Sequence, residues 1–410
     1  MEEIKLNLPF LIAGIIIFIG FLGVLFFQKT RIPDVLFLIV IGILLGPVTG
    51  WIKASSLEGI TPYFARLALI IILFEGGLHL NFDTLIKRFV GGTLFSCGAF
   101  AVSLVAMALL GKYVLNMPLI NSLILGAIIG GTSSAIVIPL ICKMTVQEET
   151  KSILSLESII TDILVVIGVI VFIEMGLKGE IKPSAILNDM AGPFSIGIVA
   201  GIVFGLVWIR ALSSIHIAAL SYMTTLAAVL VLFGVVEMAK GSGAVAAFTF
   251  GLVLSNGTRF LKVFDETKCF KLDDKIEHFH QEFTFFIRTY FFVYIGLLIS
   301  PNILQNKEVL QNALIISLGL VIARYIFLWF YYLIYEPVRK ERFIYFIMLP
   351  KGLAAAVVAS LPFAYKVPGT ENFVTYTILV ILISNIFMVF GIFIAERWII
   401  PRNSQQLTIK

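Results

Sequence analysis

The chain has 410 residues, of which 59% are hydrophobic and only 13% are charged, and its formal net charge is +5 at pH 7. Soluble globular domains carry about 25% charged residues, so this composition excludes a soluble protein and indicates one that crosses a membrane many times. The small positive charge does not indicate nucleic-acid binding. The three cysteines form no C-x-x-C pair and suggest neither a disulfide framework nor a zinc site.

Apolar runs long enough to cross a bilayer follow one another along nearly the whole chain. The first run, 8–27, has no basic flank before it and no small-residue cleavage site after it, so we expect a retained span rather than a signal peptide. The pattern predicts an all-α polytopic membrane protein with about 13 transmembrane helices. The predicted spans are 8–27, 32–50, 62–80, 90–111, 119–142, 152–176, 193–212, 217–238, 241–256, 282–299, 309–335, 342–365 and 373–396.

The distribution of Lys and Arg predicts the orientation of these spans. With the N-terminus outside, 18 of the 30 Lys and Arg residues fall in cytoplasmic loops and 8 in outer loops. Cytoplasmic loops carry the excess of positive charge, so we expect a multi-pass protein of the cell membrane with its C-terminus in the cytoplasm. An even number of spans would break this alternation, which favours the odd count.

Two of the predicted spans contain helix-breaking residues at their centres. Gly and Pro weaken a helix, and non-helical backbone at membrane depth persists only where protein buries it or where it lines a wet cavity. The two spans run in opposite directions, as is typical of transporters with inverted repeats and two discontinuous helices that cross at the ion site. Glycines that merely allow close helix packing are the alternative. The breaks comprise Gly130, Gly131, Thr132, Ser133 and Ser134 in one span and Pro350, Lys351 and Gly352 in the other.

The segment 155–166 places polar side chains inside an otherwise almost wholly apolar span. Ser158 and Asp162 lie one helical turn apart, and so do Glu157 and Thr161. A carboxylate at bilayer depth costs at least ~2.5–3.5 kcal/mol on insertion scales and usually marks an ion or proton path. We therefore predict an ion- and proton-binding site at Asp162; a polar side chain that only joins helices is the alternative.

Cationic side chains within the spans need partners of their own. Arg324 cannot lose its proton, and both Glu157 and Asp162 are candidate partners. Pairing with Arg324 would keep Asp162 ionised and unable to carry protons, so we predict a structural ion pair between Arg324 and Glu157. Lys351, at the second break, can offset the negative C-terminal end of the first half-helix of that span, and Arg288 can do the same or face lipid headgroups.

With these motifs assembled, residues 32–395 resemble the monovalent cation/proton antiporters, and among them the NhaP-like sodium/proton branch. The resemblance implies a transport core, a separate dimerisation domain, a homodimer and an elevator-like alternating-access movement. It places the core at approximately 90–176 and 309–396 and the dimerisation scaffold at approximately 1–80 and 193–299. The matching motifs are LILFEGGLHL at 71–80, GGTSSAIVIPLI at 130–141, LESIITD at 156–162, the span that carries Arg324, and PKGLAAAVV at 350–358.

The resemblance also implies roles for individual residues. Asp162 matches the aspartate that binds the cation and the proton. Ser158 and Thr132 match groups that help to coordinate the cation. Glu157 and Arg324 match the buried ion pair of the transport core.

Two departures from the family pattern concern the identity of the cation. The family usually has Asn before the aspartate, where this chain has Thr161. It often has Thr-Asp-Pro in the first break, where this chain has Thr132-Ser133-Ser134, which is closer to related potassium/proton antiporters. Both Na⁺ and K⁺ therefore stay open as the transported cation.

The expected function is secondary antiport of Na⁺, or another alkali cation, against H⁺, electroneutral at 1:1, with competition at Asp162. A K⁺/H⁺ antiporter is the main alternative; a sodium-coupled organic-anion symporter of the same fold and a channel are further ones. The chain contains no H-E-x-x-H, no G-x-S-x-G and no nucleotide or redox motif, so we expect neither an enzyme nor a cofactor. The expected partners are the alkali cation, the proton, the bilayer and a second copy of the chain.

Overall fold

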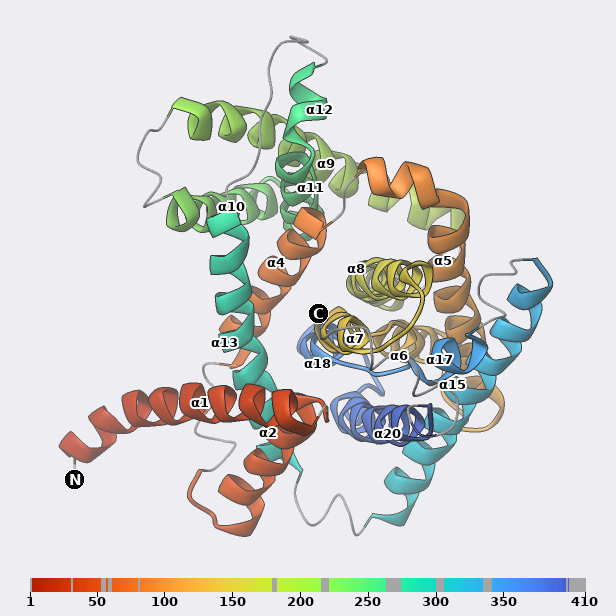
Figure 1. Cartoon of the computed structure of the whole chain (residues 1–410). Coiled ribbons are helices and arrows are strands. Elements are labelled where there is room, and N and C mark those ends of the chain that lie inside the picture. The colour runs from red at the N-terminus through yellow and green to blue at the C-terminus, as the bar shows by residue number, and fades with distance from the viewer. Residues whose placement is uncertain are drawn as a thin grey trace, which may run out of the picture. The chain divides into compact units, whose positions relative to one another are not determined.

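The computed structural model describes residues 2–30, 32–52, 57, 61–79, 82–178, 183–214, 221–262, 274–299, 306–334, 341–395 and 397. Regular structure in these residues is helical, and no strand occurs among them (Figure 1). By length and composition, six of the described helices can each cross a membrane, and shorter apolar helices accompany them. The all-α membrane fold is therefore confirmed, while the count of thirteen crossings stays a prediction.

The chain divides into two compact units, each built from separate stretches of sequence. The first unit consists of Met1–Gly59, Val90–Val169 and Arg288–Lys410, and the second of Ile60–Phe89 and Ile170–Ile287. Three helices contribute residues to both units, namely α5 (Phe82–Tyr113), α8 (Glu148–Lys178) and α13 (Asp274–Leu298).

The first unit contains both spans for which breaks were predicted. Besides the parts of α5, α8 and α13, it contains α1 (Glu2–Thr30), α2 (Asp34–Ile43), η1 (Leu44–Val48), α6 (Leu119–Gly130), α7 (Ser134–Lys143), α15 (Lys307–Ile334), α17 (Arg342–Ile347), α18 (Leu353–Val358), α19 (Leu361–Ala364) and α20 (Phe373–Ile394). Helices α6, α18 and α20 contact one another in pairs at the centre of this unit (Figure 1).

A pair of glycines lets α2 and α13 touch through their backbones. A Cβ atom added to Gly42 would lie 2.2 Å from the carbonyl oxygen of Val293, and one added to Gly296 would lie 2.3 Å from that of Ile39. Real Cβ atoms do not approach other atoms so closely, so only glycine fits at either position. Small residues at helix crossings provide such close approach in membranes, where helices gain little from excluding water.

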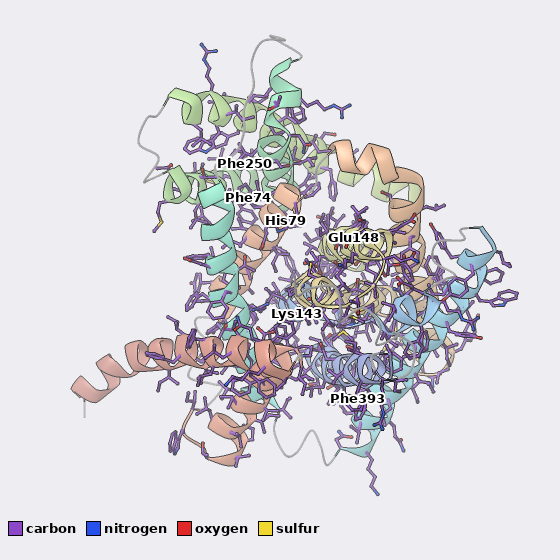
Figure 2. The ribbon with its side chains drawn as sticks, viewed as in Figure 1. Phe74, His79, Lys143, Glu148, Phe250 and Phe393 are labelled. Carbon is purple, nitrogen blue, oxygen red and sulfur yellow. The ribbon has the colours of Figure 1, made fainter. Side chains whose placement is uncertain are left out.

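The second unit packs around α11 (Gly243–Ser255), which contacts α4 (Thr61–His79), α9 (Pro183–Ser214) and α10 (Ser221–Met238); α12 (Gly257–Lys262) follows it. Gly77 and Gly251 allow backbone contact between α4 and α11, since a Cβ at either would lie within 2.3 Å of a carbonyl oxygen. Phe74 and Phe250 stack beside this contact with their ring centroids 5.5 Å apart (Figure 2). At the start of α11, Glu237 accepts a hydrogen bond from the Gly243 amide at 2.7 Å, which satisfies one of the free amides of that helix end.

Candidate ion-binding site

Both predicted breaks separate two helical segments in the structure. Helix α6 ends at Gly130 and α7 begins at Ser134, with Gly131 and Ser133 in extended conformations between them. Helix α17 ends at Ile347 and α18 begins at Leu353. Each break therefore brings free carbonyl groups from one half-helix and free amide groups from the next into the interior of the first unit.

The two breaks cross in direct contact. The Ser133 amide donates to the carbonyl of Pro350 at 2.9 Å, and the Lys351 ammonium donates to the carbonyl of Gly131 at 2.7 Å. Gly352 has no room for a side chain, since an added Cβ would lie 2.0 Å from the hydroxyl oxygen of Ser133. These contacts satisfy backbone groups that hydrocarbon would otherwise leave without partners.

Helix α20 holds the second break from its other side. The Lys351 amide donates to the Ser384 hydroxyl at 3.1 Å, and the Asn385 side-chain amide donates to the Lys351 carbonyl at 2.9 Å. Lys351 is almost completely buried, at 1% exposure. Its ammonium lies at the C-terminal end of α6, where a positive charge complements the helix dipole, and not at the end of α17, the half-helix of its own span that the sequence suggested.

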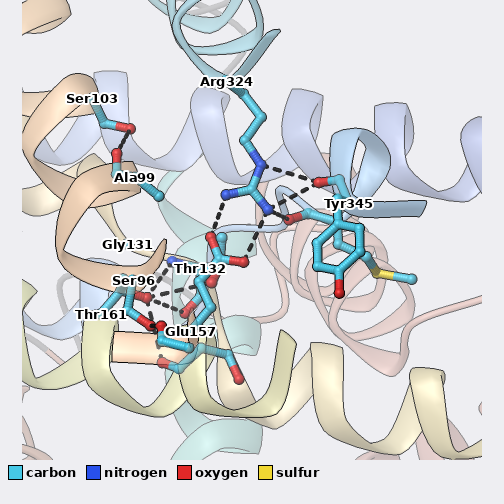
Figure 3. A network of polar contacts seen from close by, with 12 residues as sticks. Ser96, Ala99, Ser103, Gly131, Thr132, Glu157, Thr161, Arg324 and Tyr345 are labelled. Carbon is cyan, nitrogen blue, oxygen red and sulfur yellow. Dashed lines mark hydrogen bonds and ion pairs between the residues drawn. The ribbon is translucent and has the colours of Figure 1, made fainter. Parts of the chain in front are cut away.

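Helix α8 presents two neighbouring residues to the first break. The first, Thr161, accepts a hydrogen bond from the Thr132 amide at 3.0 Å, and the two hydroxyl oxygens lie 3.3 Å apart (Figure 3). The second, Asp162, contacts the first residue of α7: its Oδ2 accepts from the Ser134 amide at 3.0 Å and from the Ser134 hydroxyl at 2.6 Å. The carboxylate therefore sits at the N-terminus of α7, where unpaired amides and the helix dipole favour a negative charge.

The remaining predicted coordinating residue, Ser158, is fully buried one turn before Asp162. Its hydroxyl donates to the carbonyl of Ser155 in the same helix at 3.0 Å. The structure thus brings Thr132, Thr161 and Asp162 to one helix break with Ser158 on the adjoining turn of α8.

Glu157 and Arg324 form a two-pronged ion pair in the interior of the first unit. Both nitrogens of the guanidinium end bind the carboxylate; the Nη2–Oε2 distance is 2.9 Å (Figure 3). Arg324 also donates from Nε and Nη2 to the carbonyl of Tyr345 at 3.0 and 2.9 Å. The face of the guanidinium lies over the ring of Phe95, 5.1 Å from its centroid. The hydrogen bonds of the Arg324 guanidinium go to Glu157 and to backbone carbonyls, so Arg324 pairs with Glu157 and not with Asp162.

A second ion pair in the first unit joins α2 to α13. The Nη2 of Arg288 lies 2.7 Å from Oδ2 of Asp34, with side-chain exposures of 15% and 9%. Nη1 of the same arginine reaches the carbonyl of Ala135, in the first turn of α7, at 3.4 Å. Arg288 therefore binds a carboxylate and the first turn of α7, and not the C-terminal end of a half-helix.

Comparison with protein families gives one match that covers almost the entire chain. The model of the family described as "Sodium/hydrogen exchanger, transmembrane" matches residues 14–396. The chain belongs to the sodium/hydrogen exchanger family. An exchanger is a transporter and not an enzyme, which confirms the predicted class.

Individual relatives of this sodium/hydrogen exchanger have low sequence identity to it, but they align with most of its length. The chain is 25% identical to the "Probable Na(+)/H(+) antiporter 2" of Methanocaldococcus jannaschii over 311 residues, which cover 72% of each protein. It is 22% identical to the "K(+)/H(+) antiporter NhaP" of Alkalimonas amylolytica, over 98% of this chain and 69% of that one. The structure of the sodium proton antiporter MjNhaP1 from M. jannaschii at pH 8 superposes with a TM-score of 0.76 and 22% identity, covering 97% of both chains. The last match confirms the antiporter fold.

Two residues that bind predicted residues of the first unit, Ser134 and Asp34, were not singled out from the sequence. Ser134 lies inside the predicted break, but nothing in its spacing distinguished its hydroxyl from those of Thr132 and Ser133. Asp34 directly follows Pro33 at the start of a span, and an acid there is also typical of a solvated helix end. A prediction that paired every acid near a span with every cation in a span would have found Asp34 beside Arg288.

Proposed function

We propose that this exchanger carries an alkali cation in one direction and a proton in the other, with both binding alternately at Asp162. The observation that carries the proposal is the position of this carboxylate at the N-terminus of α7, beside the crossing of the two broken helices. Breaks in opposed helices at membrane depth are where secondary transporters bind their ions.

A single exchanging carboxylate is enough for coupled exchange. When a proton or a cation occupies Asp162, the charge at the site is neutralised and the site can change its accessible side. When Asp162 is empty and ionised, carrying it across hydrocarbon is costly, so the empty site does not cross. One carboxylate used in this way gives electroneutral exchange of one cation for one proton. The ion pair of Glu157 with Arg324 stays bonded throughout and has a structural role.

We propose Na⁺ as the transported cation, with K⁺ as the alternative. Oxygen ligands suit both ions, and the hydroxyls of Ser158, Thr132 and Thr161 lie on or next to the break that holds Asp162. Relatives named for each ion match the chain, and one named for Na⁺ has the higher identity of the two described above. The three hydroxyls would help the carboxylate to replace water around the ion.

The proposal extends to the arrangement of the protein in its membrane. We infer a multi-pass protein of the cell membrane with an outer N-terminus and a cytoplasmic C-terminus, because this orientation puts the excess of Lys and Arg inside. A homodimer with a core of about 90–176 and 309–396 that moves against a scaffold of about 1–80 and 193–299 would supply alternating access. The family membership and the inverted breaks support this arrangement.

Flux measurements on purified protein in liposomes test the proposal. Vesicles that contain a pH-sensitive dye are given each alkali cation in turn, and the wild-type protein should dissipate a pH gradient in response to Na⁺ or K⁺. Adding an ionophore that collapses the membrane potential should leave the rate unchanged if the exchange is electroneutral. A pH response to no alkali cation, or a response that requires an organic solute, would contradict the proposal.

A further inference from the structure

Ser134 supplies two hydrogen bonds to a single oxygen of Asp162, from its amide at 3.0 Å and its hydroxyl at 2.6 Å. It is the first residue of α7, and the preceding Ser133 makes no side-chain cap in the described structure. The acceptor at this helix end therefore comes from another helix, since Asp162 belongs to α8. Hydrogen bonds to an ionised acceptor are shorter and about twice as strong as neutral ones.

The hydroxyls selected from the sequence make different bonds. The Thr132 hydroxyl pairs with that of Thr161, and the Ser158 hydroxyl donates to the Ser155 carbonyl. The Ser134 hydroxyl, in contrast, is bonded to the proposed ion-binding carboxylate. The amide and the hydroxyl together hold Oδ2 of Asp162 at the first residue of α7.

We propose that Ser134 is a positioning residue of the ion site, which holds the Asp162 carboxylate in the orientation that accepts the cation. The inference deepens the proposed exchange and rests on Asp162 being the group that binds the cation. A carboxylate offers about four lone-pair sites, so one carboxylate can hold both the Ser134 donors and an ion. Ser134 acts through the carboxylate, so its effect on affinity should be similar for every alkali cation that the protein exchanges.

Three substitutions at this position remove the donors in steps. Ser134→Thr keeps both donors, Ser134→Ala removes the hydroxyl, and Ser134→Pro removes the hydroxyl and the amide hydrogen. Proline suits the start of this helix, because Ser133 is extended at φ −85° and ψ 118°, as is favoured before proline, and proline is favoured in the first turn of a helix. The loss of the amide donor can therefore be tested without breaking α7.

The experiment measures initial exchange rates in liposomes over a range of cation concentrations, separately for Na⁺, K⁺ and Li⁺. Ser134→Ala should raise the apparent KM for each exchanged cation by roughly tenfold, as expected for the loss of one charge-assisted hydrogen bond, with the maximal rate within about twofold of wild type. Ser134→Thr should restore the wild-type KM, and Ser134→Pro should exceed the Ala effect. The matched control is Ser317→Ala, whose buried hydroxyl bonds only within α15, to Ala313 at 2.8 Å, and whose KM should not change.

Several results would overturn the role of Ser134. These are an unchanged KM in folded Ser134→Ala, a fall in maximal rate at constant KM, or a change confined to one cation, which would make Ser134 a direct ligand. If Ser134→Ala does not fold, Ser134→Cys keeps the shape with a weaker donor and should raise KM in the same direction. If wild type exchanges cations, Asp162→Asn does not, and Ser134→Ala behaves as wild type, then the positioning role fails and the proposed exchange stands. If Asp162→Asn still exchanges, the proposed function itself fails.

Discussion

The guanidinium of Arg324 and the carboxylate of Glu157 bind each other through two parallel contacts, between residues that are 167 positions apart in the sequence. The pair joins α15 to α8, and the Tyr345 carbonyl completes the bonding of the arginine. A buried charge whose partner is removed is strongly destabilising, whereas the attraction within the intact pair offsets part of the cost of removing both charges from water. Loss of either partner should therefore lower the stability of the protein, whether or not it affects transport.

Glu157→Ala and Arg324→Ala should each destabilise the protein by about 3–5 kcal/mol, because each leaves a buried charge without its partner. Thermal unfolding in detergent should show the loss as a lower Tm or a lower yield of folded protein. The double variant Glu157→Ala/Arg324→Ala should lose less than the sum of the single variants, since neither charge is then left alone. Strict additivity would show that the two side chains do not interact.

Asp162→Asn should leave the protein folded and abolish exchange. The amide has the shape of the protonated acid and cannot release a proton, so neither ion can be exchanged at it. Its melting temperature should stay close to that of wild type, in contrast to the variants of the ion pair. Proton-coupled cation flux above a few per cent of wild type would contradict the assignment of Asp162.

Protons and cations should compete, because both occupy Asp162. On the acid side of the pH optimum, lowering the pH should raise the apparent KM for the cation and leave the maximal rate unchanged. The rate at a fixed cation concentration should pass through a maximum with pH, since the cation is excluded at low pH and reprotonation fails at high pH. Initial exchange rates measured at several pH values and cation concentrations test whether protons and cations compete for one site. A maximal rate that falls at constant KM would show two separate sites.

Gly352→Ala should disrupt the crossing of the broken helices, because the new Cβ would lie 2.0 Å from Oγ and 2.4 Å from Cβ of Ser133. A clear loss of Tm or of folded yield is expected. Adding Ser133→Gly removes both clashing atoms and should recover most of that stability. The control is Gly234→Ala, where no atom lies within 4 Å of the added Cβ and the helix propensity of alanine favours α10 by about 1 kcal/mol. Equal losses in both alanine variants would argue against the crossing.

The helices, the breaks and the pairing of Glu157 with Arg324 could be predicted from the sequence, because each follows from a single large free-energy penalty that a few neighbouring residues impose. Few structures are compatible with an apolar run of bilayer length or with Gly and Pro at its centre. An arginine that cannot lose its proton likewise has few possible partners inside a membrane. The bonds around Asp162 were not predictable in this way. Several hydroxyls lie within one turn of each other, and their partners depend on side-chain rotation and on how α7 and α8 approach, which no spacing in the sequence determines.

The contact between Lys351 and Gly131 spans 220 residues of sequence, and this separation has a consequence for how the protein is made. Chains enter a membrane as they are synthesised, so α6 and α7 are inserted long before α18 exists. Until then the open backbone of the first break lacks the carbonyl of Pro350 and the ammonium of Lys351, and each unsatisfied polar group costs several kcal/mol in hydrocarbon. The crossing beside the candidate ion site is thus completed only when the break between α17 and α18 has been made, and a nascent chain that stops before residue 350 cannot form it.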